Sequence, residues 1–372
     1  EGYVYQQIQP APLSELKVVD SSQLPVEEAW LLAEVTTEIL RPFDLAQGPL
    51  IRMTVWPMAP ECFRVVAVMH HSVSDGWSIP ILLNDLMAVY GAKVRGEEPV
   101  LAELPYQYAD YALWQRQWLQ GEVLETQLRY WQNQLAGAPV SLDFPSDFPR
   151  PKVLSYGGAT LNWTLSKTES ETVRCFSEQQ DVTVFMTLLL AFYTLLARYS
   201  HQTDIVVGSP IANRHHFATE AMVGFFVNTL AFRVNLEPTI TVREALTQVK
   251  AVTLGGYAHQ DVPFEQLVDY LQVPRDTSRS PLFQVMLVFQ NLPESKLALP
   301  GLVVTPFKLT TPLAKFDLTL EASWVEGQLQ FSIEYNTALF KAEKINRLAR
   351  HFKILLTALV KSPEHALSHL TL

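Results

Sequence analysis

Hydrophobic and polar residues follow helical and strand periods in turn along the first part of the chain. Apolar residues recur every three or four positions over 26–40, which predicts a helix. Residues 49–56 form a predicted strand, and 63–69 are so nearly continuously apolar that they predict a strand buried on both faces. Helical spacing returns over 78–90. This order of elements predicts an α/β arrangement.

The same mixture continues to the end of the chain. Residues 183–199 are apolar almost all round, so this helix is expected at the centre of a core. An aromatic, helical stretch runs from 106 to 136. A further strand is expected at 1–8, and its abrupt start suggests that the natural protein begins earlier. The other predicted strands are 159–165, 204–208, 223–233, 283–290, 316–322 and 328–335, and the other predicted helices are 167–180, 242–259, 264–271 and 341–360.

The length of the chain favours two domains. A chain of 372 residues is too long for one comfortable core. Pro139–Pro151 holds four prolines in a short polar segment, as inter-domain linkers do. We therefore predict domains at 1–152 and 153–372, with an α/β fold of the α+β sandwich type.

Composition and charge narrow the class of protein. Hydrophobic residues make up 48% of the chain and charged residues 18%, as in a packed globular protein. The net charge of -10 argues against nucleic acid and anionic membranes as partners. The longest apolar stretch, 184–197, is shorter than the roughly 18 residues of a membrane span, and the N-terminus has no signal pattern. With only Cys62 and Cys175 and no CxxC, the sequence predicts a cytoplasmic protein without a cysteine zinc site.

Two adjacent histidines, His70 and His71, stand where the strand 63–69 ends and before the helix 78–90. Gly76 is expected to permit the sharp turn from this strand into the helix, and Ser78 is expected to cap the helix. Together with Asp75, the histidines allow three interpretations: a structural pair in a core, a metal site, or general acid-base catalysis. No third ligand follows at a diagnostic metal spacing.

Other catalytic motifs are absent from the sequence. It has no GxSxG elbow, and neither cysteine has a motif-like neighbourhood, so no covalent nucleophile is indicated. It also has no GxGxxG or GxxxxGK[ST] motif. A direct, single-displacement transfer fits these residues better.

The stretch 70–76 resembles the HHxxxDG signature of the condensation domains of non-ribosomal peptide synthetases, relatives of chloramphenicol acetyltransferase. Further segments resemble the family's later motifs in the expected order. They are 108–115, 223–229, 259–265 and 275–282. The family's first two motifs would precede Glu1, so the resemblance implies that an N-terminal segment is missing.

The resemblance implies two acetyltransferase-like lobes that form a V-shaped pseudo-dimer with a tunnel between them. Upstream and downstream peptidyl carrier domains would deliver a donor acyl or peptidyl thioester and an acceptor aminoacyl thioester on phosphopantetheine arms, beside an adenylation domain. The acceptor amine would attack the donor thioester and form an amide. No cofactor or metal is expected on the domain itself.

The resemblance also assigns roles to single residues. His71 would act at the reacting amine, as a base or by stabilising charge. The other expected residues fall into a supporting group and a tunnel group. Support is expected from His70, Asp75 paired with Arg214, and Gly76, and the tunnel is expected to include Trp77, Ser78 and Asn228. Residues 210–214 resemble the tunnel floor and 291–312 the crossover between lobes.

Residues 69–77 with 210–214 look most like the subtype that joins an L-configured donor to an L-configured acceptor. Two alternatives stay open. One is a stand-alone acyltransferase of the same superfamily that uses coenzyme A thioesters. The other is a carrier-binding module without catalysis.

Overall fold

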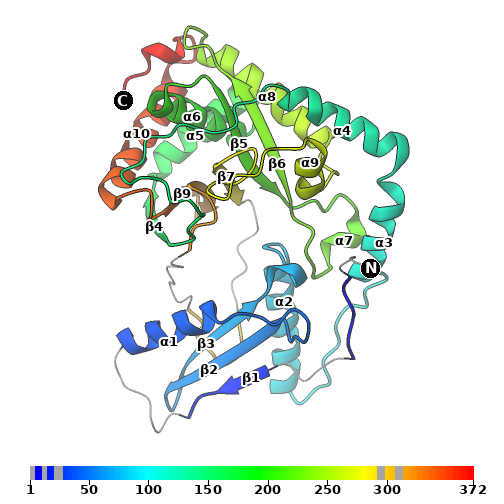
Figure 1. Cartoon of the computed structure of the whole chain (residues 1–372). Helices are drawn as coiled ribbons and strands as arrows, with labels where there is room; N and C mark the ends of the chain where they lie inside the picture. Colours follow the sequence, from blue (N-terminus) through cyan, green and yellow to red (C-terminus); the bar gives the residue numbers. More distant parts are fainter. Residues whose placement is uncertain (1–4, 11–14, 21–27, 291–297, 306–312) are drawn as a thin grey trace. The chain divides into compact units, whose positions relative to one another are not determined.

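The computed structural model describes residues 5–10, 15–20, 28–290, 298–305 and 313–372 as a mixed α/β fold (Figure 1). The chain forms two compact units. The first combines Glu1–Tyr108, Glu220–Phe226 and Leu297–Leu309, and the second contains the rest of the chain. Each unit has its own sheet within the described residues.

The sheet of the first unit has three strands in the order β1-β2-β3. Helix α1 (Glu28–Leu40) packs against this sheet, and its Leu31 and Val35 form a small core with Trp56 of β2. The first strand pairs parallel with the second, and the third is antiparallel to it. The strands are β1 (Glu15–Val18), β2 (Ile51–Ala59) and β3 (Cys62–Met69).

Two expectations for this unit are wrong. Strand β3 is not buried on both faces, because Phe63 and Val65 are 50% and 58% exposed. An apolar run alone does not reveal whether a second layer covers the sheet. The strand expected at 1–8 is not formed by Tyr5–Ile8, while residues 1–4 lie outside the described part. Instead, β1, which the hydrophobic pattern missed, takes the position beside β2.

The second unit is built on a six-stranded sheet in the order β4-β9-β8-β7-β5-β6. The turn between β8 and β9 places Glu326 and Gly327 at φ of 50° and 79°, as a two-residue hairpin turn of this type requires. The strands are β4 (Gly158–Thr164), β5 (Asp204–Ile211), β6 (Asn228–Asn235), β7 (Val285–Gln290), β8 (Leu318–Val325) and β9 (Gln328–Asn336).

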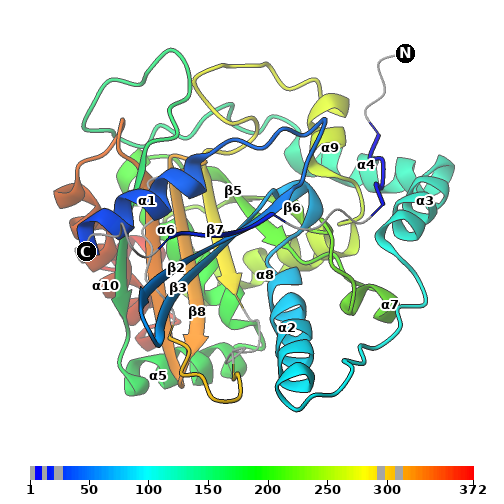
Figure 2. The ribbon, with the colours of Figure 1, turned by 90° about the horizontal axis from the view of Figure 1, so that it is seen from below.

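Helices cover one side of this sheet (Figure 2). Helix α6 is central, since every residue from Phe185 to Leu196 is buried, which confirms the expectation from its all-round apolar pattern. The helices concerned are α5 (Lys167–Gln179), α6 (Val184–Ser200), α8 (Val242–Ala258) and α10 (Ala342–Lys361). Short helices lie elsewhere in the chain at α7 (Phe217–Glu220), α9 (Phe264–Tyr270) and a 3-10 turn at Leu367–His369.

The compact units differ from the predicted domains 1–152 and 153–372. The expected helical stretch 106–136 is broken into α3 (Tyr108–Trp118) and α4 (Gly121–Leu135), with Gly121 at a φ of 53°. Trp131 of α4 is buried in the core of the second unit. The proline-rich segment follows α4 onto that unit, where the Leu142 amide donates to the Gln284 side chain. The chain therefore enters the second unit near residue 109.

Within the described ranges, no single helix has the length and apolar character of a membrane span. Helices α5 and α6 meet that test only as a pair bent by 103°. The cytoplasmic location stays a prediction. Of the expected crossover 291–312, only residues 298–305 lie in the described part of the chain.

Candidate active site

The histidine pair lies directly after β3 in the first unit. His71 begins a one-turn 3-10 helix, His71–Val73. The Nδ1 atom of His70 caps this turn, accepting a hydrogen bond from the Ser72 amide at 3.2 Å and lying 2.8 Å from the Ser72 hydroxyl. The other side of the His70 ring meets Phe43 edge-on at 5.8 Å. These contacts support the expected supporting role of His70.

The His71 imidazole, in contrast, is exposed. Its ring meets the Phe225 ring edge-on, with 5.1 Å between centroids and an angle of 81°. Among the residues that the structure describes, neither ring nitrogen of His71 has a hydrogen-bond partner. The nitrogens are therefore available to a ligand that approaches the end of β3.

Asp75 anchors the loop that follows. It is only 5% exposed. One carboxylate oxygen accepts hydrogen bonds from the Ser78 amide at 2.9 Å and the Ser78 hydroxyl at 2.8 Å, and the other accepts from the Phe226 amide at 3.0 Å. A carboxylate held in this way supports a structural role. Arg214 belongs to the second unit, where it donates to the Thr219 carbonyl, and its pairing with Asp75 stays a prediction.

Ser78 has a different place from the one expected. It is fully buried, and its hydroxyl lies 3.1 Å from both the amide nitrogen and the carbonyl oxygen of Gly224. Ser78 is the first residue of α2 (Ser78–Val94), so the side chain at the helix start is that of Asp75. These contacts join the start of α2 to the loop at Gly224, and the place of Ser78 in a tunnel stays a prediction.

Trp77 and Gly76 complete the signature. The Trp77 indole donates to the Glu220 carbonyl at 3.0 Å, a contact within the first unit. The expectation that the turn needs a glycine at position 76 is wrong. Gly76 has no positive φ, and a Cβ atom there would meet no atom of the described residues within 4 Å.

The loop that receives Asp75 and Ser78 was expected to be the start of a buried strand. Residues 223–227 form no strand, and β6 begins only at Asn228. Tyr108 packs so closely on Gly224 that a Cβ atom has no room there, and its hydroxyl donates to the Phe225 carbonyl at 2.8 Å. The sequence motif pointed to this stretch, but hydrophobic pattern alone could not separate loop from strand.

Asn228 is buried at the start of β6 in the second unit. Its amide nitrogen donates to the carbonyls of Gln260 and Val262, both at 2.8 Å. Its oxygen accepts from the amides of Thr229 and Phe264 at 2.8 and 3.0 Å. Three of these four bonds tie the start of β6 to residues 260–264, which satisfies the buried amide, and the place of Asn228 in a tunnel stays a prediction.

The segment 259–265 serves as a junction in the same unit. The Trp131 indole donates to the His259 carbonyl at 2.6 Å, and the Gln127 amide donates to Asp261 at 2.5 Å. This segment, which resembles one of the family's later motifs, therefore holds α4 to the end of α8.

A cavity of about 270 Å³ lies in the second unit. Asn213, from the expected floor loop, contributes to its wall. The other lining residues are mainly aromatic or polar: Tyr111, Trp114, Gln115, Trp118, His215, His216, Thr219, Gln260 and Asp261. In the described part of the chain, no group of three or more His, Cys, Asp or Glu side chains is arranged to hold a metal ion.

Comparison with solved structures defines the fold. An X-domain from teicoplanin biosynthesis superposes with a TM-score of 0.89 at 25% identity, covering 99% of this chain and 83% of that one. A four-domain nonribosomal peptide synthetase, solved in its holo form with AMP and glycine, superposes with a TM-score of 0.86 at 26% identity, covering 97% of this chain and 28% of that one. The fold is thus that of the condensation domains found in such synthetases.

Sequence comparison gives the family. The family model of the condensation domain matches residues 1–372, so the chain belongs to the condensation-domain family. A linear gramicidin synthase of Brevibacillus parabrevis is 45% identical over 367 residues, which are 98% of this chain. The chain spans only 5% of that relative's length. The class of this chain, as a condensation domain, is that of the amide-forming acyltransferases of nonribosomal peptide synthesis.

Proposed function

We propose that this chain forms an amide bond between two substrates held as thioesters on peptidyl carrier domains. The acceptor amine attacks the donor carbonyl, the C–N bond forms, the C–S bond breaks, and the donor arm leaves as a thiol. The amine loses one proton in this exchange. The exposed His71 imidazole, on a turn fixed by His70, is the observation that carries the proposal.

His71 serves this reaction either as the base that takes the amine proton or as a hydrogen-bonding group that stabilises the charged intermediate. Both roles need a ring nitrogen that can reach the amine, and both agree with the exposed ring. His70 contributes by capping the turn, and Asp75 by holding the loop.

The setting of the reaction follows from the family. We propose upstream and downstream carrier domains as partners, a neighbouring adenylation domain, and a cytoplasmic location. The phosphopantetheine arms belong to the carriers. We further propose the subtype that joins an L-configured donor to an L-configured acceptor, because 69–77 and 210–214 resemble that subtype.

The test is incubation of the protein with loaded donor and acceptor carriers, with mass spectrometry of the acceptor arm. We expect a new amide, and we expect His71→Ala to lower its single-turnover rate by about 10²–10⁴-fold, as for loss of a positioned general base. The variant should keep its unfolding midpoint, since the ring is exposed. His70→Ala is the matched control and should lose stability first, because it removes a cap.

Two results would contradict the proposal. Product from free coenzyme A thioesters without carriers would favour the stand-alone acyltransferase. Carrier binding without any amide would favour a binding module. A domain of this fold has been solved in a complex with another protein, namely the X-domain with OxyB from teicoplanin biosynthesis. If amide forms at a near-normal rate in His71→Ala, alignment of the two thioesters and not the histidine would supply the rate enhancement.

A further inference from the structure

We propose that Phe225 is a positioning residue for His71: its ring holds the imidazole in the orientation that the reaction needs. The inference rests on the proposed function of His71. The two rings meet edge-on at 5.1 Å, within the range of favourable aromatic pairs. His71 sits on a single 3-10 turn and is otherwise exposed, so this contact is a main restraint on its side-chain rotation.

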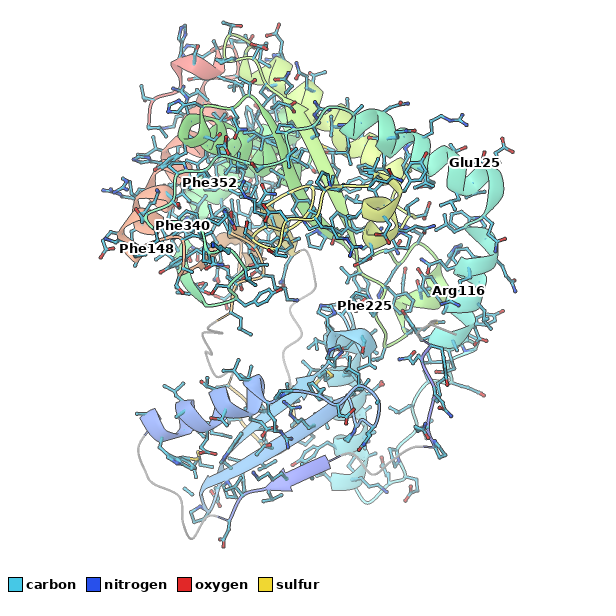
Figure 3. The ribbon with its side chains drawn as sticks, viewed as in Figure 1. Arg116, Glu125, Phe148, Phe225, Phe340 and Phe352 are labelled. Atoms are coloured by element: carbon cyan, nitrogen blue, oxygen red, sulfur yellow. The ribbon has the colours of Figure 1, made fainter. Side chains whose placement is uncertain are left out.

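Phe225 can act as a restraint because its own backbone is fixed on both sides. Before it, the Gly224 amide donates to the buried Ser78 hydroxyl at 3.1 Å. After it, the Phe226 amide donates to Asp75. The Phe225 carbonyl itself accepts the Tyr108 hydroxyl at 2.8 Å. Figure 3 shows Phe225 beside the start of α2.

The two adjacent phenylalanines of this loop, Phe225 and Phe226, differ in burial and in their contacts. Phe226 is 2% exposed and packs edge-on against Tyr108 at 5.1 Å, as a core residue does. Phe225 is 39% exposed, so its ring is not a core residue. Its side chain is the one turned to the imidazole. Asp75 and Ser78 fix the backbone on either side of Phe225, and the Phe225 ring in turn contacts the His71 ring.

A loss of orientation should appear in the chemical step more than in binding. Misplacement of a reacting group by about 1 Å can cost about 10²-fold in rate. We expect Phe225→Ala to lower the single-turnover rate with saturating carriers by about 10- to 100-fold, with little change in the carrier concentration at half-maximal rate. Phe225→Tyr keeps the ring and should keep the rate.

A structural readout separates this role from a fold defect. In protein labelled at histidine, the His71 ring signals are identified by their loss in His71→Ala. Phe225→Ala and Phe225→Leu should both shift these signals, because they remove the neighbouring ring current, whereas Phe225→Tyr should leave them near their original place. Phe63→Ala is the matched control: Phe63 is 50% exposed in the same unit, and neither rate nor signals should change.

Unchanged His71 signals in Phe225→Ala would overturn the proposal, as would an unchanged single-turnover rate. If Phe225→Ala lowers the unfolding midpoint, Phe225→Leu decides, since it keeps apolar volume and lacks only the ring. If the unsubstituted protein forms no amide, the proposed function fails, and the ring signals then decide only whether the Phe225 ring contacts the His71 ring.

Discussion

Removal of the Asp75 carboxylate should destabilise the first unit by a predictable amount. In Asp75→Ala, the buried Phe226 amide loses an acceptor at 3.0 Å, while the two bonds to Ser78 have substitutes in the carbonyls of Asp75 and Gly224. With about 1–3 kcal/mol for the amide and about 0.5–1.5 kcal/mol for each Ser78 bond, the total is about 2–6 kcal/mol.

Urea unfolding and hydrogen exchange would measure this effect. We expect a lower unfolding midpoint and faster amide exchange in the peptide that contains residues 220–226. Asp85→Ala is the matched control, because Asp85 is exposed on α2 of the same unit. Asp75→Asn keeps one acceptor oxygen and should lie between the two variants.

An unchanged midpoint and unchanged exchange in Asp75→Ala would refute this reasoning. Combined with lost turnover, that result would place Asp75 among the catalytic residues. A double-mutant cycle with Arg214→Gln tests the predicted ion pair separately. A coupling energy near zero would exclude the pair, whereas a pair in contact should couple by about 0.5–3 kcal/mol.

Two further predictions concern stability. Arg52 is 4% exposed and donates to Glu38 at 2.6 Å, so Arg52→Ala should cost about 3–5 kcal/mol in urea unfolding, and no loss would contradict a buried pair. Glu169 has a pKa lowered to about 2, first by its contact with Lys353 and then by the Ser166 amide. Because the folded pKa lies below the ordinary value of 4.5, its stabilisation is present above that value and is lost as the pH falls toward 2. Glu169→Gln should therefore flatten the pH dependence of the unfolding midpoint in this window, and an unchanged slope would contradict the shift.

Local pattern predicted most of the regular elements. Strand β3 and helix α6 were identified by their nearly continuous apolar runs, and β2, β8, β9 and α10 by hydrophobic patterns typical of strands and helices. The same reasoning missed β1. That strand is four residues long, and it is defined by its parallel partner β2. A strand of four residues is too short to show a recognisable hydrophobic period in the sequence.

The candidate site was predictable as a motif and not as a geometry. The signature gave His71 and Asp75 by resemblance. The receiving groups on Gly224 and Phe226 lie 146 to 151 residues away from their partners in the chain. No local period encodes such a contact, which is why 223–227 was expected to be a strand. The expectation that the turn needs a glycine at position 76 was wrong for a related reason, since the sequence does not reveal whether the φ of a glycine is positive.

The insertion of residues 220–226 into the first unit affects how the chain can be cut and how it folds during synthesis. A ribosome that has released residues 1–108 has made the whole HHxxxDG stretch, but the Phe226 amide does not yet exist for Asp75 to bind. The loop around His71 can thus reach its final form only after much of the second unit has emerged. A fragment that ends near residue 108, or a chimera joined between 109 and 226, would keep the signature and lose or replace its support. Module exchange in such synthetases should therefore move residues 1–226 together.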